Sequence, residues 1–150
     1  MAAGIRGLGI GAERSYAPSR MRLVVVGAVL VLVATAVELL LATLLRAAFG
    51  VPAGFSPLTA PAVATMTVAG MIGATVLFGW MAGARPDPRA AFVRIALVVL
   101  VLSWLPDLAI WVTGVFPHTT GGGIISLMVL HPVAAGIAIG ILYRFGAPAR

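Results

Sequence analysis

The chain has 150 residues, of which 61% are hydrophobic and 9% are charged, and its mean hydropathy is +1.13. A water-soluble domain of this length could not bury so much apolar surface in one core, so lipid must solvate part of it. The net charge of +6 does not indicate nucleic-acid binding, because the arginines that carry it flank apolar runs, as the positive-inside rule requires.

Residues 1–21 mix Gly, Ala, Arg and Ser without periodicity, which predicts a flexible cytoplasmic tail. The apolar run over residues 23–45 follows, and as a helix it is long enough to cross a hydrocarbon core of about 30 Å. A signal peptide that is cleaved near residues 34–36 is an alternative. Because the apolar run continues past that site, we favour a first transmembrane helix.

Three further apolar runs predict transmembrane helices over residues 57–81, 89–112 and 123–145. Ser56 followed by proline is a suitable start for the second span, and Thr59 is a competing start. Asp87 can cap the third span, because a proline follows it in the first turn. The run of glycines at 121–123 is expected to break the chain before the fourth span.

The arginines predict the orientation of this bundle, which occupies residues 22–145 and is followed by a second cytoplasmic tail at residues 146–150. All of them except Arg46 precede the first span, lie between or just inside the second and third spans, or follow the fourth. Short arginine-rich segments are retained in the cytoplasm, so both termini are expected there. The prediction is an all-α, four-helix, multi-pass protein of a bacterial inner membrane.

Small residues spaced by four predict the faces on which these helices pack. Gly136 and Gly140 have this spacing in the fourth span, while Gly70 and Gly73 each have an alanine four residues away in the second. Packing inside the bundle is favoured over a face between two copies, because a four-helix protein must first bury its own contacts.

Ionisable residues inside the predicted spans are the best functional clue. Glu38, Asp107 and His131 lie about 9 to 12 Å below the outer boundary at about 1.5 Å per residue, so they are expected to form one polar cluster. Thr65 reaches a similar depth, and Arg46 lies two helical turns from Glu38 on the same face. Since a charge at mid-bilayer costs about 3 kcal/mol on insertion scales, these side chains should face the bundle interior.

Prolines adjoin two members of this cluster. Pro106 and Pro132 each remove a backbone donor and free a carbonyl one turn earlier, near Leu102 and Met128, so both helices are expected to kink. Kinked helices with freed carbonyls beside ionisable groups also occur in transporter sites.

Indoles accompany the buried aspartate. Trp104 lies one turn before Asp107 and Trp111 one turn after it, so both indoles could donate hydrogen bonds to the acid.

No motif specifies a reaction, and neither an enzyme activity, a cofactor nor a metal site is expected. The chain has no cysteine, so a zinc site on His118 and His131 would need both buried acids as further ligands. Glu38 and Asp107 lack the substrate anchors of a hydrolase site. Ser103 could complete a Ser-His-Asp set, but these residue types occur together in most chains.

Three short segments carry a family pattern: SWLPDL at residues 103–108, SLMVLHPVAA at 126–135 and FSPL at 55–58. Together they resemble a family of small actinobacterial four-helix membrane proteins that is classed as a domain of unknown function. The resemblance covers about residues 22–143 and implies four spans, a recurring L-M-x-x-H element that ends here at His131, and no known activity. The proline after this histidine departs from the apolar or β-branched residue expected there.

Two functions follow from these observations. The first is a non-enzymatic structural or accessory membrane component, whose buried polar cluster holds the helices in register. The second is a small transporter or proton-linked ligand-binding protein that uses Glu38, Asp107 and His131. The expected partners are the lipid bilayer and either a second copy of the chain or other membrane proteins, without nucleic acid.

Overall fold

The computed structural model describes residues 18–85 and 87–146, so most of the predicted tails lies outside the described part. Its elements in chain order are α1 (Arg20–Phe49), a 3₁₀ turn η1 (Ser56–Leu58), α2 (Ala60–Ala84), α3 (Pro88–Thr113) and α4 (Gly121–Phe145). All four α-helices are long and apolar enough to cross a membrane. The predicted all-α, four-helix fold is confirmed.

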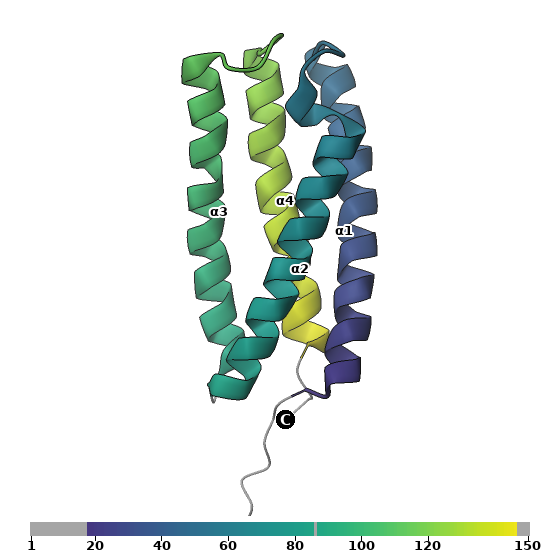
Figure 1. Cartoon of the computed structure of the whole chain (residues 1–150), viewed down its shortest axis with the longest axis vertical. Helices are drawn as coiled ribbons and strands as arrows, with labels where there is room; N and C mark the ends of the chain where they lie inside the picture. The colour runs from purple at the N-terminus through teal and green to yellow at the C-terminus, as the bar shows by residue number, and fades with distance from the viewer. Residues whose placement is uncertain (1–17, 86, 147–150) are drawn as a thin grey trace, which may run out of the picture.

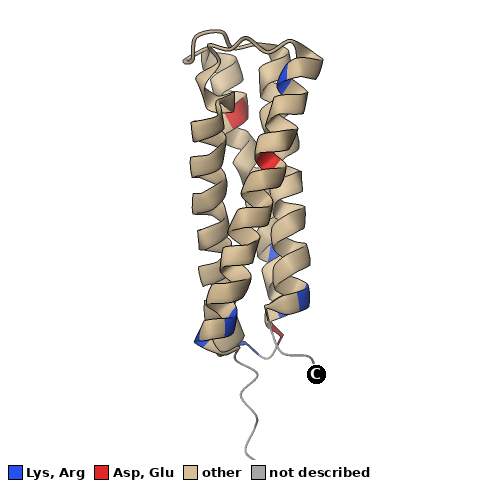
Figure 2. Ribbon diagram, turned by 90° about the vertical axis from the view of Figure 1, so that its right-hand side faces the viewer, with Lys and Arg blue, Asp and Glu red and all other residues tan. Residues whose placement is uncertain are grey.

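The helices form one elongated bundle in which α2 slants across the others, from α1 at one end toward α3 at the other (Figure 1). α1 begins and α4 ends at the same end of the bundle as the α2–α3 connection. We call this the basic end, because the helix termini there carry Arg20, Arg22, Arg85, Arg89 and Arg144. Figure 2 shows most of the basic positions gathered at this end. Arg46 lies near the opposite end.

α3 begins at its predicted cap, Asp87, whereas α2 does not begin at the start that we favoured, Ser56. The Asp87 carboxylate accepts a hydrogen bond from the backbone N–H of Ala90 at 3.2 Å. α2 begins at the competing site, with Thr59 in the N-cap position. Ser56 belongs instead to the separate turn η1, which ends before the helix begins.

The glycines at 121–123 form the first turn of α4 and do not break the chain before it. The Thr120 side chain caps this turn by accepting a hydrogen bond from the Gly123 N–H at 3.1 Å. A side-chain carbon at Gly122 would lie 2.8 Å from Phe49, and one at Gly123 would lie 2.9 Å from Phe55. These glycines therefore let two aromatic residues pack directly against the helix backbone.

The interior contains two hydrophobic clusters, one in each half of the bundle. The cluster nearer the basic end comprises Leu30, Ala34, Met71, Phe78, Met81, Ala82, Phe92, Ala138 and Leu142. The cluster nearer the opposite end comprises Ala42, Val51, Phe55, Leu58, Val63, Ile124, Leu127 and Leu130. Two buried polar residues separate the clusters, Glu38 on α1 and Thr67 on α2.

α3 is the helix with the least buried surface. Only Phe92 and Asp107 are buried along its length, and its outward face consists of exposed aliphatic residues. The Phe92 ring packs edge-on against Phe78 of α2, with the ring centroids 5.4 Å apart. An aromatic contact in one half and a polar contact in the other therefore attach α3 to the bundle.

The four glycines that were expected to pack the helices together lie on the outside of the bundle. Gly70, Gly73, Gly136 and Gly140 are exposed, and a side-chain carbon at any of them would meet no atom within 4 Å. Internal packing is therefore not their role in a single chain, because they lie on outward faces. Gly27 makes the close contact instead, since a side-chain carbon there would lie 2.7 Å from Thr75 of α2.

Candidate functional site

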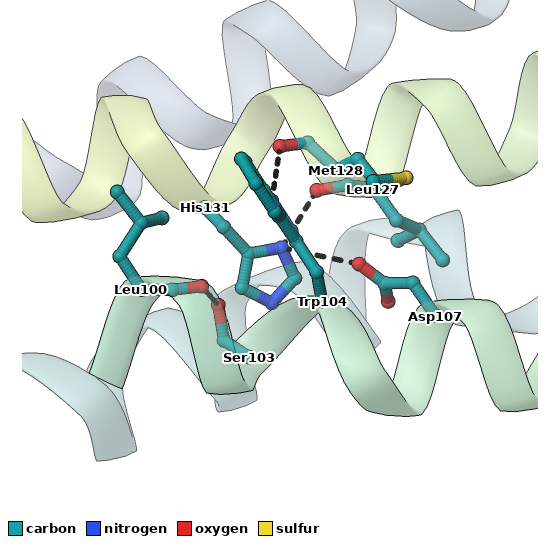
Figure 3. Close-up of polar contacts among 7 residues, drawn as sticks. All are labelled: Leu100, Ser103, Trp104, Asp107, Leu127, Met128 and His131. Carbon is teal, nitrogen blue, oxygen red and sulfur yellow. Dashed lines mark hydrogen bonds and ion pairs between the residues drawn. The ribbon is translucent and has the colours of Figure 1, made fainter. Parts of the chain in front are cut away.

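Asp107 of α3 and His131 of α4 meet between these two helices in the half of the bundle away from the basic end (Figure 3). The Asp107 residue is 4% exposed, and its Oδ2 atom lies 3.4 Å from Nδ1 of His131. His131 is only half-buried. The contact therefore connects a buried acid to an imidazole at the edge of the α3–α4 interface.

A second contact defines the state of the His131 ring. Its Nδ1 atom lies 2.8 Å from the backbone carbonyl oxygen of Leu127, one turn earlier in α4. Because a carbonyl oxygen can only accept a hydrogen bond, the hydrogen must be on Nδ1. The same Nδ1 atom therefore faces both the Leu127 carbonyl oxygen and the Asp107 carboxylate.

A tryptophan adds a third interaction between the same helices. The indole N–H of Trp104 donates a hydrogen bond of 3.1 Å to the backbone carbonyl of Met128 (Figure 3). This carbonyl is the one that Pro132 leaves without a helical donor, because proline has no N–H. The predicted indole donor and the predicted free carbonyl are thus partners, and the indole does not bond to Asp107.

The two prolines lie on the lipid-facing side of this arrangement. Pro106 and Pro132 are both exposed, and α3 and α4 continue through them as helices. The kinks expected at these positions stay predictions.

Glu38 lies apart from this pair. It is 2% exposed, and among residues 18–85 and 87–146 no hydrogen bond or ion pair connects it to Asp107 or His131. α1 and α3 lie on opposite sides of the bundle (Figure 1), so equal depth did not bring these acids together. The structure therefore divides the expected cluster into an Asp107–His131 contact and a separate buried carboxyl group.

The surroundings of Glu38 leave polar atoms without partners. Its Oε1 atom and the Oγ1 atom of Thr35, one turn earlier in α1, are buried and have no hydrogen-bond partner within the described residues. Ala34 and Ala42, at the positions four residues before and after it, are also buried, so this face of α1 points into the bundle. The Oδ2 atom of Asp107 is also buried without a hydrogen-bond partner, but it makes the ion-pair contact with His131, whereas Glu38 makes no ion pair within the described residues.

Arg46 and Thr65 do not join the polar cluster. The Arg46 guanidinium donates hydrogen bonds to the carbonyl oxygens of Leu58 at 3.2 Å and Pro52 at 3.3 Å, so it holds the α1–α2 connection. Thr65 is exposed, whereas Thr67 is buried. The spacing of Thr67 by four residues from Val63 and Met71, both buried, is the signal that could have identified it.

Neither a catalytic triad nor a metal site is assembled in the described part of the chain. The Ser103 hydroxyl donates a hydrogen bond of 2.7 Å to the Leu100 carbonyl of its own helix and does not bond to His131. No group of three or more His, Asp or Glu side chains suited to a metal ion occurs within residues 18–85 and 87–146.

The sequence profile of a family of unknown function (DUF6069) matches residues 15–147, which is nearly the whole chain. Neither a curated protein nor a solved structure matches the chain significantly.

Proposed function

The chain belongs to this family of unknown function (DUF6069), and we propose that it is a non-enzymatic structural or accessory component of the membrane. The observation that carries the proposal is the Asp107–His131 contact, at 3.4 Å between α3 and α4. Together with the hydrogen bond from Trp104 to Met128, it directs polar groups of these helices toward each other. Polar contacts between helices inside a membrane, of which the Trp104 hydrogen bond is one, stabilise the association of helices that otherwise present only apolar surface.

The proposal includes a location and an orientation. The arginines at the basic end support a bacterial inner membrane protein with both termini in the cytoplasm. Its partners would be the lipid bilayer and either other membrane proteins or a second copy of the chain. The exposed aliphatic face of α3 and the exposed glycines of α2 and α4 would be available for such contacts.

A double-mutant cycle on the contact tests the proposal. Thermal unfolding in detergent is measured for Asp107→Asn, His131→Gln and the double variant. Each single variant is expected to unfold at a lower temperature, with a coupling of about 0.5 to 1.7 kcal/mol between the two sites. Ser103→Ala is the matched control on α3, because its hydroxyl bonds only within its own helix. If both single variants are as stable as this control, the structural role is excluded.

One observation favours a second function, a small transporter or proton-linked ligand-binding protein. The buried Glu38 carboxyl has an oxygen without a hydrogen-bond partner among the described residues, and the Asp107–His131 contact does not include it. Such a group can bind a proton or a small ligand inside the bundle.

The same measurement, extended to Glu38→Gln between about pH 5 and 8, separates the two functions. A wild-type response to pH that Glu38→Gln abolishes without unfolding the protein would support the second function. A Glu38→Gln variant that is much less stable at every pH would support a structural role.

A further inference from the structure

An open groove of about 640 Å³ lies between α3 and α4 near the basic end, away from the Asp107–His131 contact. Its lining residues are Arg89 and Val93 of α3 and Ile139, Gly140, Tyr143 and Arg144 of α4.

The lining changes from basic to apolar along the helices. Arg89 lies in the first turn of α3, and Val93 lies one turn farther from the basic end. Likewise on α4, Arg144 lies in the last turn and Gly140 one turn farther in. The groove is therefore cationic where lipid headgroups lie and apolar toward the hydrocarbon region.

The two arginines are held at the walls of the groove. The Arg89 guanidinium lies over the Tyr143 ring, 5.4 Å from its centroid, and so connects α3 to α4. The Arg144 guanidinium lies 5.9 Å from the centroid of Phe145. Arg89 already has other interactions within the protein, but a guanidinium carries five N–H donors, so both arginines can still donate to a phosphate oxygen.

The charges around the groove favour an anion. The described residues of the basic end include a single acid, Asp87, and its carboxylate caps α3 through Ala90. The apolar part of the groove is also open, because a side-chain carbon at Gly140 or at Gly136, one turn farther along α4, would meet nothing within 4 Å. An extended hydrocarbon chain could lie over these two glycines.

We propose that this groove binds one anionic phospholipid, with its phosphate between Arg89 and Arg144 and an acyl chain along Val93, Gly140 and Gly136. The proposal does not depend on the function proposed above. Basic pockets between transmembrane helices are suited to anionic headgroups, and the apolar half of the groove distinguishes a lipid from a free phosphate ion.

Native mass spectrometry of the detergent-solubilised protein tests the proposal, with phosphatidylglycerol as the probe. The wild type is expected to retain one phosphatidylglycerol in preference to phosphatidylcholine. The double variant Arg89→Gln/Arg144→Gln is expected to bind it about 25-fold more weakly, since each arginine near an anionic lipid contributes about a factor of five. Inorganic phosphate is not expected to compete.

The matched control is Arg20→Gln/Arg85→Gln, which removes the same charge from the basic end outside the groove. This variant is expected to keep wild-type binding. An equal loss in both double variants would overturn the proposal, because the attraction would then be that of the whole basic end. Competition by inorganic phosphate at similar concentration would overturn the assignment to a lipid.

A second variant tests the groove without a change of charge. Gly140→Leu places a side chain in the open space over α4, so it is expected to abolish retention of the lipid and to leave the unfolding temperature in lipid-free detergent near that of the wild type. Unchanged lipid retention would overturn the proposal. If Gly140→Leu instead converts a dimer into a monomer in the same spectra, the groove is an interface between two copies and the proposal is wrong.

Discussion

The carbonyl of Met128 illustrates how this membrane protein satisfies a polar group that a proline has exposed. Pro132 cannot donate to it, and no water competes for it in hydrocarbon, so its partner must come from a neighbouring helix. Trp104 of α3 supplies the N–H at 3.1 Å. The proline in α4 and the tryptophan in α3 therefore form one structural unit, although they are far apart in the chain.

This unit makes a reciprocal prediction. Trp104→Phe keeps an aromatic ring but removes the donor, and we expect it to lower the free energy of unfolding by about 0.6 to 2 kcal/mol. Pro132→Ala restores the helical N–H to the Met128 carbonyl, so the cost of Trp104→Phe should be much smaller in that background. Thermal unfolding of the two single variants and the double variant measures this difference. If Trp104→Phe lowers the free energy of unfolding equally with proline and with alanine at position 132, the indole N–H does not compensate for the missing helical donor.

Individual contacts were only partly predictable at this scale. The sequence showed that Asp107, His131, Trp104 and the Met128 carbonyl were polar groups in apolar helices, but it did not show which would meet. Thr65 was chosen by depth, yet Thr67, two residues along, faces the interior. Two residues rotate a helix by about 200°, so depth without a known inward face selects the wrong side chain.

Between elements, Gly27 of α1 lies directly against the side chain of Thr75 of α2. The Thr75 hydroxyl donates a hydrogen bond of 2.8 Å to the Met71 carbonyl of its own helix, which holds its methyl group against Gly27. Small residues at such contacts let helices approach each other closely in lipid.

We therefore predict opposite effects for two glycine substitutions in α1 and α2. Gly27→Ala places a carbon 2.7 Å from the Thr75 methyl, so the helices must separate, at a cost of about 1 to 3 kcal/mol. Gly70→Ala enters open space and should leave stability unchanged or raise it by up to about 1 kcal/mol. Unfolding temperatures in detergent test both, and a destabilised Gly70→Ala would show that this glycine packs against another molecule.

The existence and approximate extent of the helices were predictable, because each apolar run is long and Asp87 is a specific cap. The glycines at 121–123 were misread as a break. Because they have no side chains, Phe49 and Phe55 can pack against the helix backbone at this point. This tertiary contact outweighs the low helix propensity of glycine.

For the whole molecule, the arrangement of the helices decided which polar residues could meet. Four spans of similar length leave the neighbours of each helix undefined, so the sequence could place Glu38 and Asp107 at one depth but not on opposite sides of the bundle. The α2–α3 connection brings those helices together only at the basic end, because α2 slants away along the bundle (Figure 1). This slant leaves the remainder of α3 dependent on α4.

The expected orientation, with the basic end in the cytoplasm, can be tested by labelling single cysteines. The chain has no cysteine, so single cysteines report the side of the membrane without background. With the basic end in the cytoplasm, Ser56→Cys should react with a membrane-impermeant maleimide in spheroplasts, and Ala84→Cys should react only after permeabilisation. The reverse pattern would place both termini outside.

The contact between Asp107 and His131 also has a consequence for insertion of the protein into a bilayer. An aspartate within a lone helix opposes transfer from the translocon, by up to about 3 kcal/mol at the helix centre. Its partner lies on α4, which follows α3 after only residues 114–120. Partitioning of the two helices as a single hairpin would provide the histidine before the acid meets lipid, so we expect α3 and α4 to be released into the bilayer together and not one after the other.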